Sequence, residues 1–138
     1  MFKILKPLIL FYIGGFSYYI IEILWRGYSH FSMTIVGGIC FLLIGSINEV
    51  FDWDMPIIHQ MFYSSLMITI VEFFAGLLLN VILNLNIWDY SNMKFNLMGQ
   101  ICLLYSFLWF FLSAAAIVLD DYLRYWLFDE EKPHYQLL

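Results

Sequence analysis

The chain has 138 residues, of which 63% are hydrophobic and 12% are charged, and its formal net charge is −5. This composition is too apolar and too poor in charge for a soluble domain of this length, so the surplus apolar surface requires lipid. Nucleic-acid binding is excluded, because a surface that follows phosphates needs clustered Lys and Arg, and the six in this chain are scattered. A spanning helix needs roughly 20 residues, so the length accommodates about four spans without a separate soluble or cofactor-binding domain.

We therefore expect an all-α, polytopic membrane protein, folded as a single domain that is a bundle of four transmembrane helices and holds no cofactor. The predicted spans cover approximately residues 7–25, 31–51, 57–85 and 100–119, and the last continues as a helix into an acidic tail over 120–138. The first apolar run ends without a small-residue cleavage site, so we interpret it as a retained span and not as a signal peptide. The positive-inside rule favours cytoplasmic termini, because one face collects Lys3, Lys6, Arg124 and Lys132 against Arg26 and Lys94 on the other.

The third predicted span carries a polar face. Helical spacing aligns Ser65, Thr69, Glu72, Gly76 and Asn80 at steps of three and four. Glu72 lies near the centre of this span, where a carboxylate without a partner costs roughly 2.5–3.5 kcal/mol, so it must face protein or water or be protonated. One interpretation is a lined pathway or a proton-exchanging site. The other is that these side chains only hold helices together, as small and polar residues commonly do in lipid.

Similar stripes mark the other spans, and they include Glu22 in the first and Glu49 in the second. A polar stripe on every helix is typical of a bundle with a polar interior or of an oligomeric pore, and also of tight packing. Two acids, Glu22 and Asp120, each stand four residues before an arginine, so local ion pairs are predicted. The hairpin after the second span collects Glu49, Asp52, Asp54 and His59, which we interpret as a solvated acidic turn and not as a metal site.

The polar segment between the third and fourth spans is dense in hydrogen-bonding and interfacial residues. It contains Trp88, Asp89, Tyr90, Ser91 and Asn96, and by topology it shares a membrane face with Arg26. A structural role explains these residues, since Asp89 can cap a turn and Asn96 can cap the entry to the fourth helix. The alternative is a mouth over the polar interior, with Arg26 as the ion-pair partner of Asp89.

The chain lacks the local signatures of common enzymes. It has no zinc-binding His-Glu-x-x-His motif, no phosphate-binding glycine loop and no Gly-x-Ser-x-Gly elbow. A lipid-modifying enzyme, a third and less favoured class, could use Glu72 and His59, but on one helix these two stand about 20 Å apart by helical rise and cannot act together without a break or another chain. We therefore expect the protein not to be an enzyme.

One group of residues resembles a known family. The tetrapeptide Trp88-Asp89-Tyr90-Ser91 is followed by Asn96, Gly99-Gln100-Ile101-Cys102 and Trp109, and acidic or glycine positions stand at Glu22, Gly37-Gly38, Asn48-Glu49, Glu72 and Gly76. Together they resemble the signature of the bacterial ABC-transporter type IV membrane family over most of the chain. The resemblance implies a bacterial inner-membrane location and a role in transport. Because the chain has no Walker-type loop, any ATPase would be a separate subunit.

These observations favour a small membrane protein that moves or gates passage of a small solute or ion, with Glu72 in the path. We expect a homo-oligomer or an assembly with other membrane subunits. The alternative is a scaffold or assembly subunit whose polar stripes bind other helices without transport.

Overall fold

The computed structural model describes residues 2–50 and 55–135, and it is built almost entirely from helices. Four α-helices follow one another along the chain, and a π-helical segment and two very short strands separate the third from the fourth. The elements in order are α1 (Phe2–Arg26), α2 (Ser32–Val50), α3 (Ile57–Gly76), η1 (Leu77–Ile82), β1 (Asn96–Leu97), β2 (Ile101–Cys102) and α4 (Leu103–Phe128).

The helical class predicted from composition is confirmed, with four helices. Three stretches are long and apolar enough to cross a membrane, namely Lys3–Arg26, Ile57–Ile82 and Leu103–Phe128. The described apolar part of α2, Ser32–Ile47, is shorter than the other three. The lengths therefore support membrane crossing for α1, for α3 with η1, and for α4. That α2 also crosses stays a prediction.

The entry to α4 differs from the expectation that a helix begins at Gln100. Asn96 and Leu97 instead pair antiparallel with Cys102 and Ile101, so the helix begins at Leu103. The Asn96 side chain does not cap α4, because it donates to the Met93 carbonyl and accepts from the Gly99 amide within the preceding turn. These bonds hold residues 93–99 in a compact turn, and α4 begins only after it.

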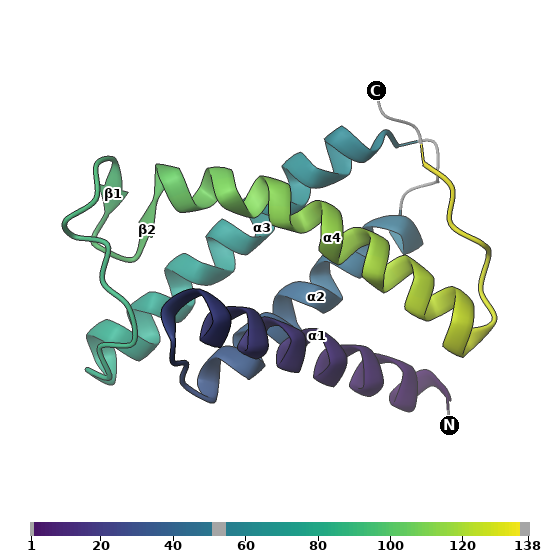
Figure 1. Ribbon diagram of the computed structural model, residues 1–138, viewed down its shortest axis with the longest axis horizontal. Coiled ribbons are helices and arrows are strands. Elements are labelled where there is room, and N and C mark those ends of the chain that lie inside the picture. Colours follow the sequence, from purple (N-terminus) through teal and green to yellow (C-terminus); the bar gives the residue numbers. More distant parts are fainter. Residues whose placement is uncertain (1, 51–54, 136–138) are drawn as a thin grey trace.

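The helices pack as two pairs (Figure 1). The most extensive packing is between α1 and α2 and between α3 and α4. The α1–α2 connection and the long α3–α4 segment lie at one end of the molecule, and the start of α1 and the end of α4 lie at the other. Each pair thus consists of helices that are consecutive in the chain, as is common in helix bundles.

Glycines bring α1 and α2 into close contact. A side chain at Gly15 would overlap the backbone carbonyl of Thr34, and a Cβ at Gly38 would lie 2.7 Å from the Phe11 ring. Small residues at such positions let helix backbones approach closely, which is the main way that helices associate in lipid.

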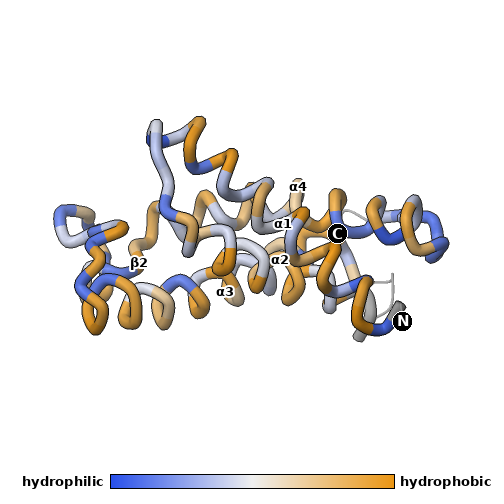
Figure 2. The backbone as a smooth tube through the Cα atoms, turned by 90° about the horizontal axis from the view of Figure 1, so that it is seen from below, coloured by the Kyte–Doolittle hydropathy of each residue, from blue (hydrophilic) through white to orange (hydrophobic). Residues whose placement is uncertain are grey.

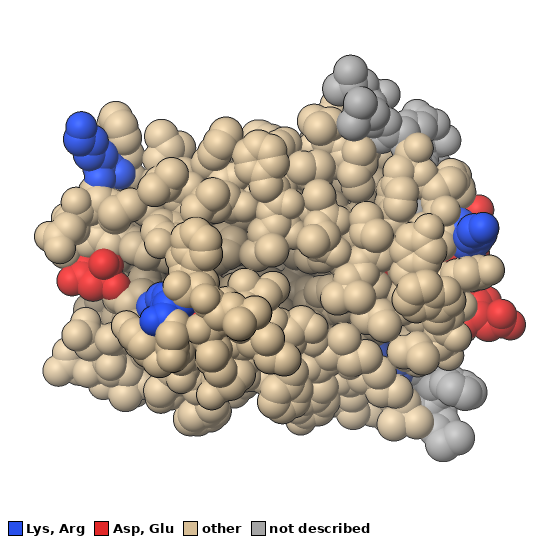
Figure 3. Space-filling view, in the orientation of Figure 1, with Lys and Arg blue, Asp and Glu red and all other residues tan. Residues whose placement is uncertain are grey.

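The outer surface is strongly apolar. Large hydrophobic side chains are exposed along all four helices, among them Phe16, Ile70, Phe74 and Phe107. Figure 2 shows that hydrophobic residues recur along the backbone of α1 to α4. On the face seen in Figure 3, the Lys, Arg, Asp and Glu atoms lie toward the two ends and the belt between them is uncharged. A soluble monomer rarely exposes an apolar area of this extent, so the belt is suited to contact with lipid.

Candidate functional site

Glu72 is the central polar group of the site. Its side chain is on α3 and is only 8% exposed. The Trp109 indole donates to Oε1 at 3.2 Å and the Tyr90 hydroxyl donates to Oε2 at 3.0 Å. The two donors come from α4 and from the α3–α4 segment, so this carboxylate joins three parts of the chain.

Tyr90 lies outside the helices, and its environment keeps it a donor. Burial, together with the adjacent Glu72 carboxylate, raises the pKa of Tyr90 far above its usual range. A phenol with a raised pKa stays protonated at neutral pH, so its hydrogen bond to Glu72 persists. The aromatic ring also stacks on Tyr105 of α4, with ring centroids 4.9 Å apart.

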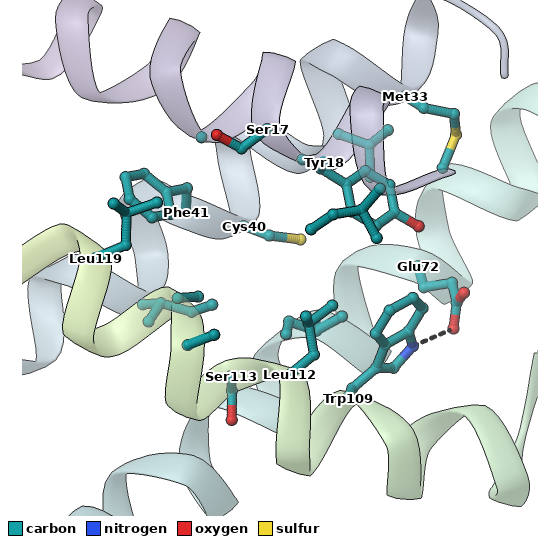
Figure 4. Close-up of a pocket in the computed structure, with 18 of the residues that line it drawn as sticks. Ser17, Tyr18, Met33, Cys40, Phe41, Glu72, Trp109, Leu112, Ser113 and Leu119 are labelled. Atoms are coloured by element: carbon teal, nitrogen blue, oxygen red, sulfur yellow. Dashed lines mark hydrogen bonds between the residues drawn. The ribbon is translucent and has the colours of Figure 1, made fainter. Parts of the chain in front are cut away.

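A cavity of about 150 Å³ lies beside Glu72, among the helices (Figure 4). Its lining comes from both helix pairs, with Tyr18 from α1, Cys40 from α2, Glu72 from α3 and Trp109 from α4. Most of the remaining lining is apolar, and Glu72 lies at one side of the cavity next to Trp109 and Tyr18. The cavity therefore combines one carboxylate with a largely hydrocarbon and aromatic surface.

The other residues of the predicted polar face have partners within the chain. The Thr69 hydroxyl donates to Ser106 Oγ of α4 at 3.0 Å, and the Ser65 hydroxyl donates to the Phe62 carbonyl of its own helix. Gly76 lies against the loop, because a Cβ there would be 2.5 Å from Gln100 Oε1 and 3.1 Å from Trp88. Much of the predicted polar face therefore contacts α4 or the α3–α4 segment. Of its five residues, Glu72 lines the cavity.

Asn80, in η1, forms hydrogen bonds that hold the α3–α4 segment against this helical segment. Its Oδ1 accepts from the Ile87 amide at 2.7 Å and from the Trp88 amide at 3.4 Å, and its Nδ2 donates to Gln100 Oε1 at 3.0 Å. The Trp88 indole in turn donates to the Gln100 carbonyl at 2.9 Å. This network buries Trp88 and turns its ring toward the cavity that it helps to line.

The exposed part of the same segment is a separate turn. The Asp89 carboxylate accepts from the Ser91 amide at 2.9 Å, and the backbone amide of Tyr90 donates to the Gly99 carbonyl. Hydrogen bonds to the carboxylate from the backbone and side chain of Ser91 hold the pKa of Asp89 below its usual range. Of the loop residues that the sequence indicated, Trp88 and Tyr90 reach the cavity region, whereas Asp89, Ser91 and Asn96 form this turn.

Arg26, which the alternative interpretation of the loop paired with Asp89, has other partners in the structure. Its Nε lies 3.0 Å from the Glu22 carboxylate, one helical turn earlier, and its NH1 donates to the Ile87 carbonyl at 3.2 Å. Glu22 also accepts from the Tyr18 hydroxyl at 3.4 Å. The local pair of Glu22 with Arg26 was predictable, and the bond to Ile87 additionally ties the end of α1 to the loop.

A second polar group occupies the opposite end of the molecule. Asp120 and Arg124 form a buried pair on α4, with Oδ2 and Nε 2.8 Å apart, as their spacing predicted. Glu130 pairs with Lys6 of α1 and lies 4.0 Å from Arg124. The Tyr135 hydroxyl donates to Asp121, and its burial beside that carboxylate raises the pKa of Tyr135.

Several contributors to the site were missed from the sequence. Tyr18, Cys40 and Trp109 line the cavity, and Gln100 holds the loop. Trp109 was recognisable as the one tryptophan inside a predicted span, where an indole N–H needs a partner. The side chain of Glu49, together with Asp52 and Asp54, lies outside the described residues, while His59 is exposed in the first turn of α3. Across 2–50 and 55–135, no three His, Cys, Asp or Glu side chains are grouped to hold a metal ion.

The helices and the apolar belt define a multi-pass α-helical membrane protein. Residues 9–132 match the model of the family described as "Putative ABC-transporter type IV", and the chain belongs to that family. The resemblance seen in the sequence is thereby confirmed. Searches of curated proteins and of solved structures gave no match.

Proposed function

We propose that this protein is a membrane component of a transporter, that all four helices cross the bilayer, and that a small solute or ion passes by Glu72. One observation carries the proposal: the carboxylate borders a cavity to which all four helices contribute. Ionisable side chains within apolar spans commonly mark substrate or ion pathways, because their insertion is otherwise unfavourable.

The surroundings of Glu72 support a role beyond packing. An ionised carboxylate offers about four lone-pair sites, and the two hydrogen bonds from Trp109 and Tyr90 leave capacity for a further ligand. The same two bonds hold the carboxylate in one orientation beside the cavity. Pre-positioned groups of this kind lower the reorganisation needed when a ligand arrives.

The assembly that we propose includes further subunits. Since the sequence has no phosphate-binding glycine loop, an ATPase would be a separate protein. Homo-oligomers or other membrane subunits would cover part of the exposed apolar surface. We propose a bacterial cell membrane with cytoplasmic termini as the setting, on the basis of the family and of the Lys and Arg distribution.

The proposal is tested by flux in proteoliposomes prepared from native membranes, so that co-purifying subunits are retained. Internal dyes for pH and for small cations report the movement, with and without ATP. We expect flux in the wild type, its loss in Glu72→Gln, and its retention in Thr69→Val, which changes the same helix away from the cavity. Equal flux in Glu72→Gln and wild type, at every pH, would remove Glu72 from the mechanism.

A non-transporting scaffold is the alternative, and it is favoured by the bonds that the α3 polar face makes within the chain. Thr69, Gly76 and Asn80 all contact α4 or the loop. If these contacts are the whole purpose of the face, a stoichiometric membrane partner should co-purify, and its loss should unfold this chain without any effect on flux. A lipid-modifying enzyme, the third possibility, should turn over labelled lipid in native lipid extract.

A further inference from the structure

We propose that the cavity beside Glu72 binds a small organic ammonium ion, with its cationic head between Glu72 and the aromatic rings and its alkyl groups in the apolar part. This inference names the class of solute for the proposed function. That the bound ion is also transported rests on that proposed function. The binding itself can be tested without transport.

Charge is the first argument. Glu72 lies in the apolar interior, and among the ion pairs of the described residues none involves it. Its two hydrogen-bond partners, Trp109 and Tyr90, are neutral donors. Arg26, the base at this end of α1, is bound to Glu22. A carboxylate without a basic partner in a medium of low polarity attracts a cation.

The aromatic lining is the second argument. Tyr18, Trp88 and Trp109 line the cavity together with Glu72. The Tyr18 and Trp109 rings are 6.1 Å apart at an interplanar angle of 62°, so they meet at a corner rather than as a flat stack. Figure 4 shows both rings next to the carboxylate. The Trp109 ring directs its N–H edge to the carboxylate, which leaves its face for other contacts. Proteins recognise quaternary and alkylated ammonium groups with aromatic rings grouped in this way.

Size and polarity of the remaining lining are the third argument. Away from Glu72 the cavity is bordered mainly by apolar groups such as Val36, Leu112 and Ala116. Its volume of about 150 Å³ equals that of an engineered apolar cavity in another protein that admits benzene. A head group with a few methyl or methylene substituents matches this volume.

An inorganic cation suits the same lining poorly. Ca²⁺ requires about six to eight oxygen ligands, and Mg²⁺ keeps several waters beside carboxylates. Over the described part of the chain there is no cluster of three or more acidic, His or Cys side chains. Apolar carbon contacts replace the lost hydration of an alkylated ammonium ion but not that of a small metal ion.

Protection of a thiol in the cavity tests the binding directly. Cys40 lines the cavity, and its sulfur is drawn toward the interior in Figure 4, whereas Cys102 lies outside the lining and is 2% exposed. The purified chain in detergent is treated with a small alkylating reagent, and modification at both cysteines is followed by mass spectrometry. Choline serves as the cationic probe and 3,3-dimethylbutan-1-ol as its neutral isostere. Cys102 is the internal control.

We expect choline to slow alkylation of Cys40 and not of Cys102, and the neutral isostere to have no effect at the same concentration. Glu72→Gln should abolish this protection. Trp109→Leu should raise the half-protecting concentration roughly tenfold or more, from loss of a desolvated cation–ring contact. Thr69→Val should leave protection as in the wild type.

Protection by the neutral isostere equal to that by choline, or no protection by choline in the wild type, would overturn the inference. Both comparisons use the unmodified chain, so they hold even if Glu72→Gln fails to fold. Flux that depends on Glu72 without choline protection would leave the proposed transport intact and remove this class of ligand. Choline protection without flux of labelled choline into the same proteoliposomes would support this class of ligand and remove the proposed transport.

Discussion

The turn at Asp89 is governed by a single exposed carboxylate. Its oxygen accepts from the Ser91 amide, and a Cβ at Gly99 would lie 3.0 Å from the same oxygen. The bonds from Ser91 favour the ionised form and lower the pKa of Asp89. A group whose pKa is lowered by folding contributes stability above its ordinary pKa, and this contribution is lost as the pH falls through the folded value.

We therefore predict that the turn loosens in acid. The ordinary pKa of Asp89 is 3.8, so protection of the Ser91 amide from hydrogen exchange should be constant above that pH and decline below it. Asp89→Asn is the matched control, because it keeps an oxygen acceptor and cannot titrate in this range. The same acid-induced decline in Asp89→Asn would show that another group controls the turn.

For single residues, the sequence predicted which ionisable side chain is central and which ion pairs form within one helix. Glu72 stood out because a charge in mid-span is unfavourable, and Glu22 with Arg26 followed from their spacing of four. Tyr90 and Trp109 could not be assigned to Glu72, because the first lies in an irregular segment and the second on another helix. In the structure Arg26 pairs with Glu22 and not with Asp89, the partner in the alternative interpretation of the loop, because a carboxylate one helical turn away is closer than one in a separate segment.

Among the elements, the α3–α4 segment depends most on one side chain. Asn80 accepts a hydrogen bond from the Ile87 amide and donates one to Gln100, so a single side chain serves both groups. Asn80 lies within the π-helical segment η1, Leu77–Ile82. π-helical turns inside helices occur frequently at functional sites.

Asn80→Ala should release this segment while α1 to α4 stay folded. The Ile87 amide and the Gln100 side chain would lose a partner, at a cost of about 1–3 kcal/mol for each buried group left unsatisfied. Limited proteolysis and hydrogen exchange should show increased opening over residues 86–100. Asn92→Ala, in the exposed turn of the same segment, is the control and should behave as wild type.

The long helices were predictable from hydropathy, but their ends and interruptions were not. Residues 57–85 appeared as one span, and the structure divides this stretch into α3 and η1. Apolar composition sets helix length but carries no signal for a wider turn in the backbone. The short β1–β2 pairing was missed because Ile101 and Cys102 continue the apolar pattern of the helix after them.

The molecule as a whole is closed at one end by ion pairs that differ in burial. The side chains of Asp120 and Arg124 are 0% and 8% exposed, whereas those of Lys6 and Glu130 are 26% and 33% exposed. In addition, the Asp120 carboxylate fills the space beside Gly45 of α2, where a Cβ would be 2.5 Å away. The inner pair thus also determines helix packing.

Asp120→Ala should destabilise the fold by roughly 3–5 kcal/mol, since removing one partner of a buried pair leaves charge without its closest counterpart. Glu130→Ala should cost at most about 1 kcal/mol, as exposed pairs do. Reversible unfolding in mixed micelles measures both. Equal losses would mean that the outer Lys6–Glu130 pair contributes as much stability as the buried pair, contrary to this prediction.

Topology at the molecular scale is testable through two exposed positions. Lys94 lies in the α3–α4 segment and His134 follows α4. The α3–α4 segment and the end of α4 lie at opposite ends of the molecule in Figure 1. With four crossings, single cysteines at the two positions should react with an impermeant reagent from opposite sides of the membrane. Labelling of both from one side would contradict the four-span arrangement.

The two helix pairs have a mechanical consequence. Each pair is tightly packed internally, and the cavity lies where they meet. Helix α1 contacts segments of the other pair near both of its ends. Lys6 pairs with Glu130, just after α4, and Arg26 donates to the Ile87 carbonyl in the α3–α4 segment. Between these two contacts the pairs also meet through α2, which packs on both α3 and α4. Loss of the Lys6 contact or of the Arg26 contact alone would therefore leave α1 held at one end of the molecule and free of the other pair at the opposite end.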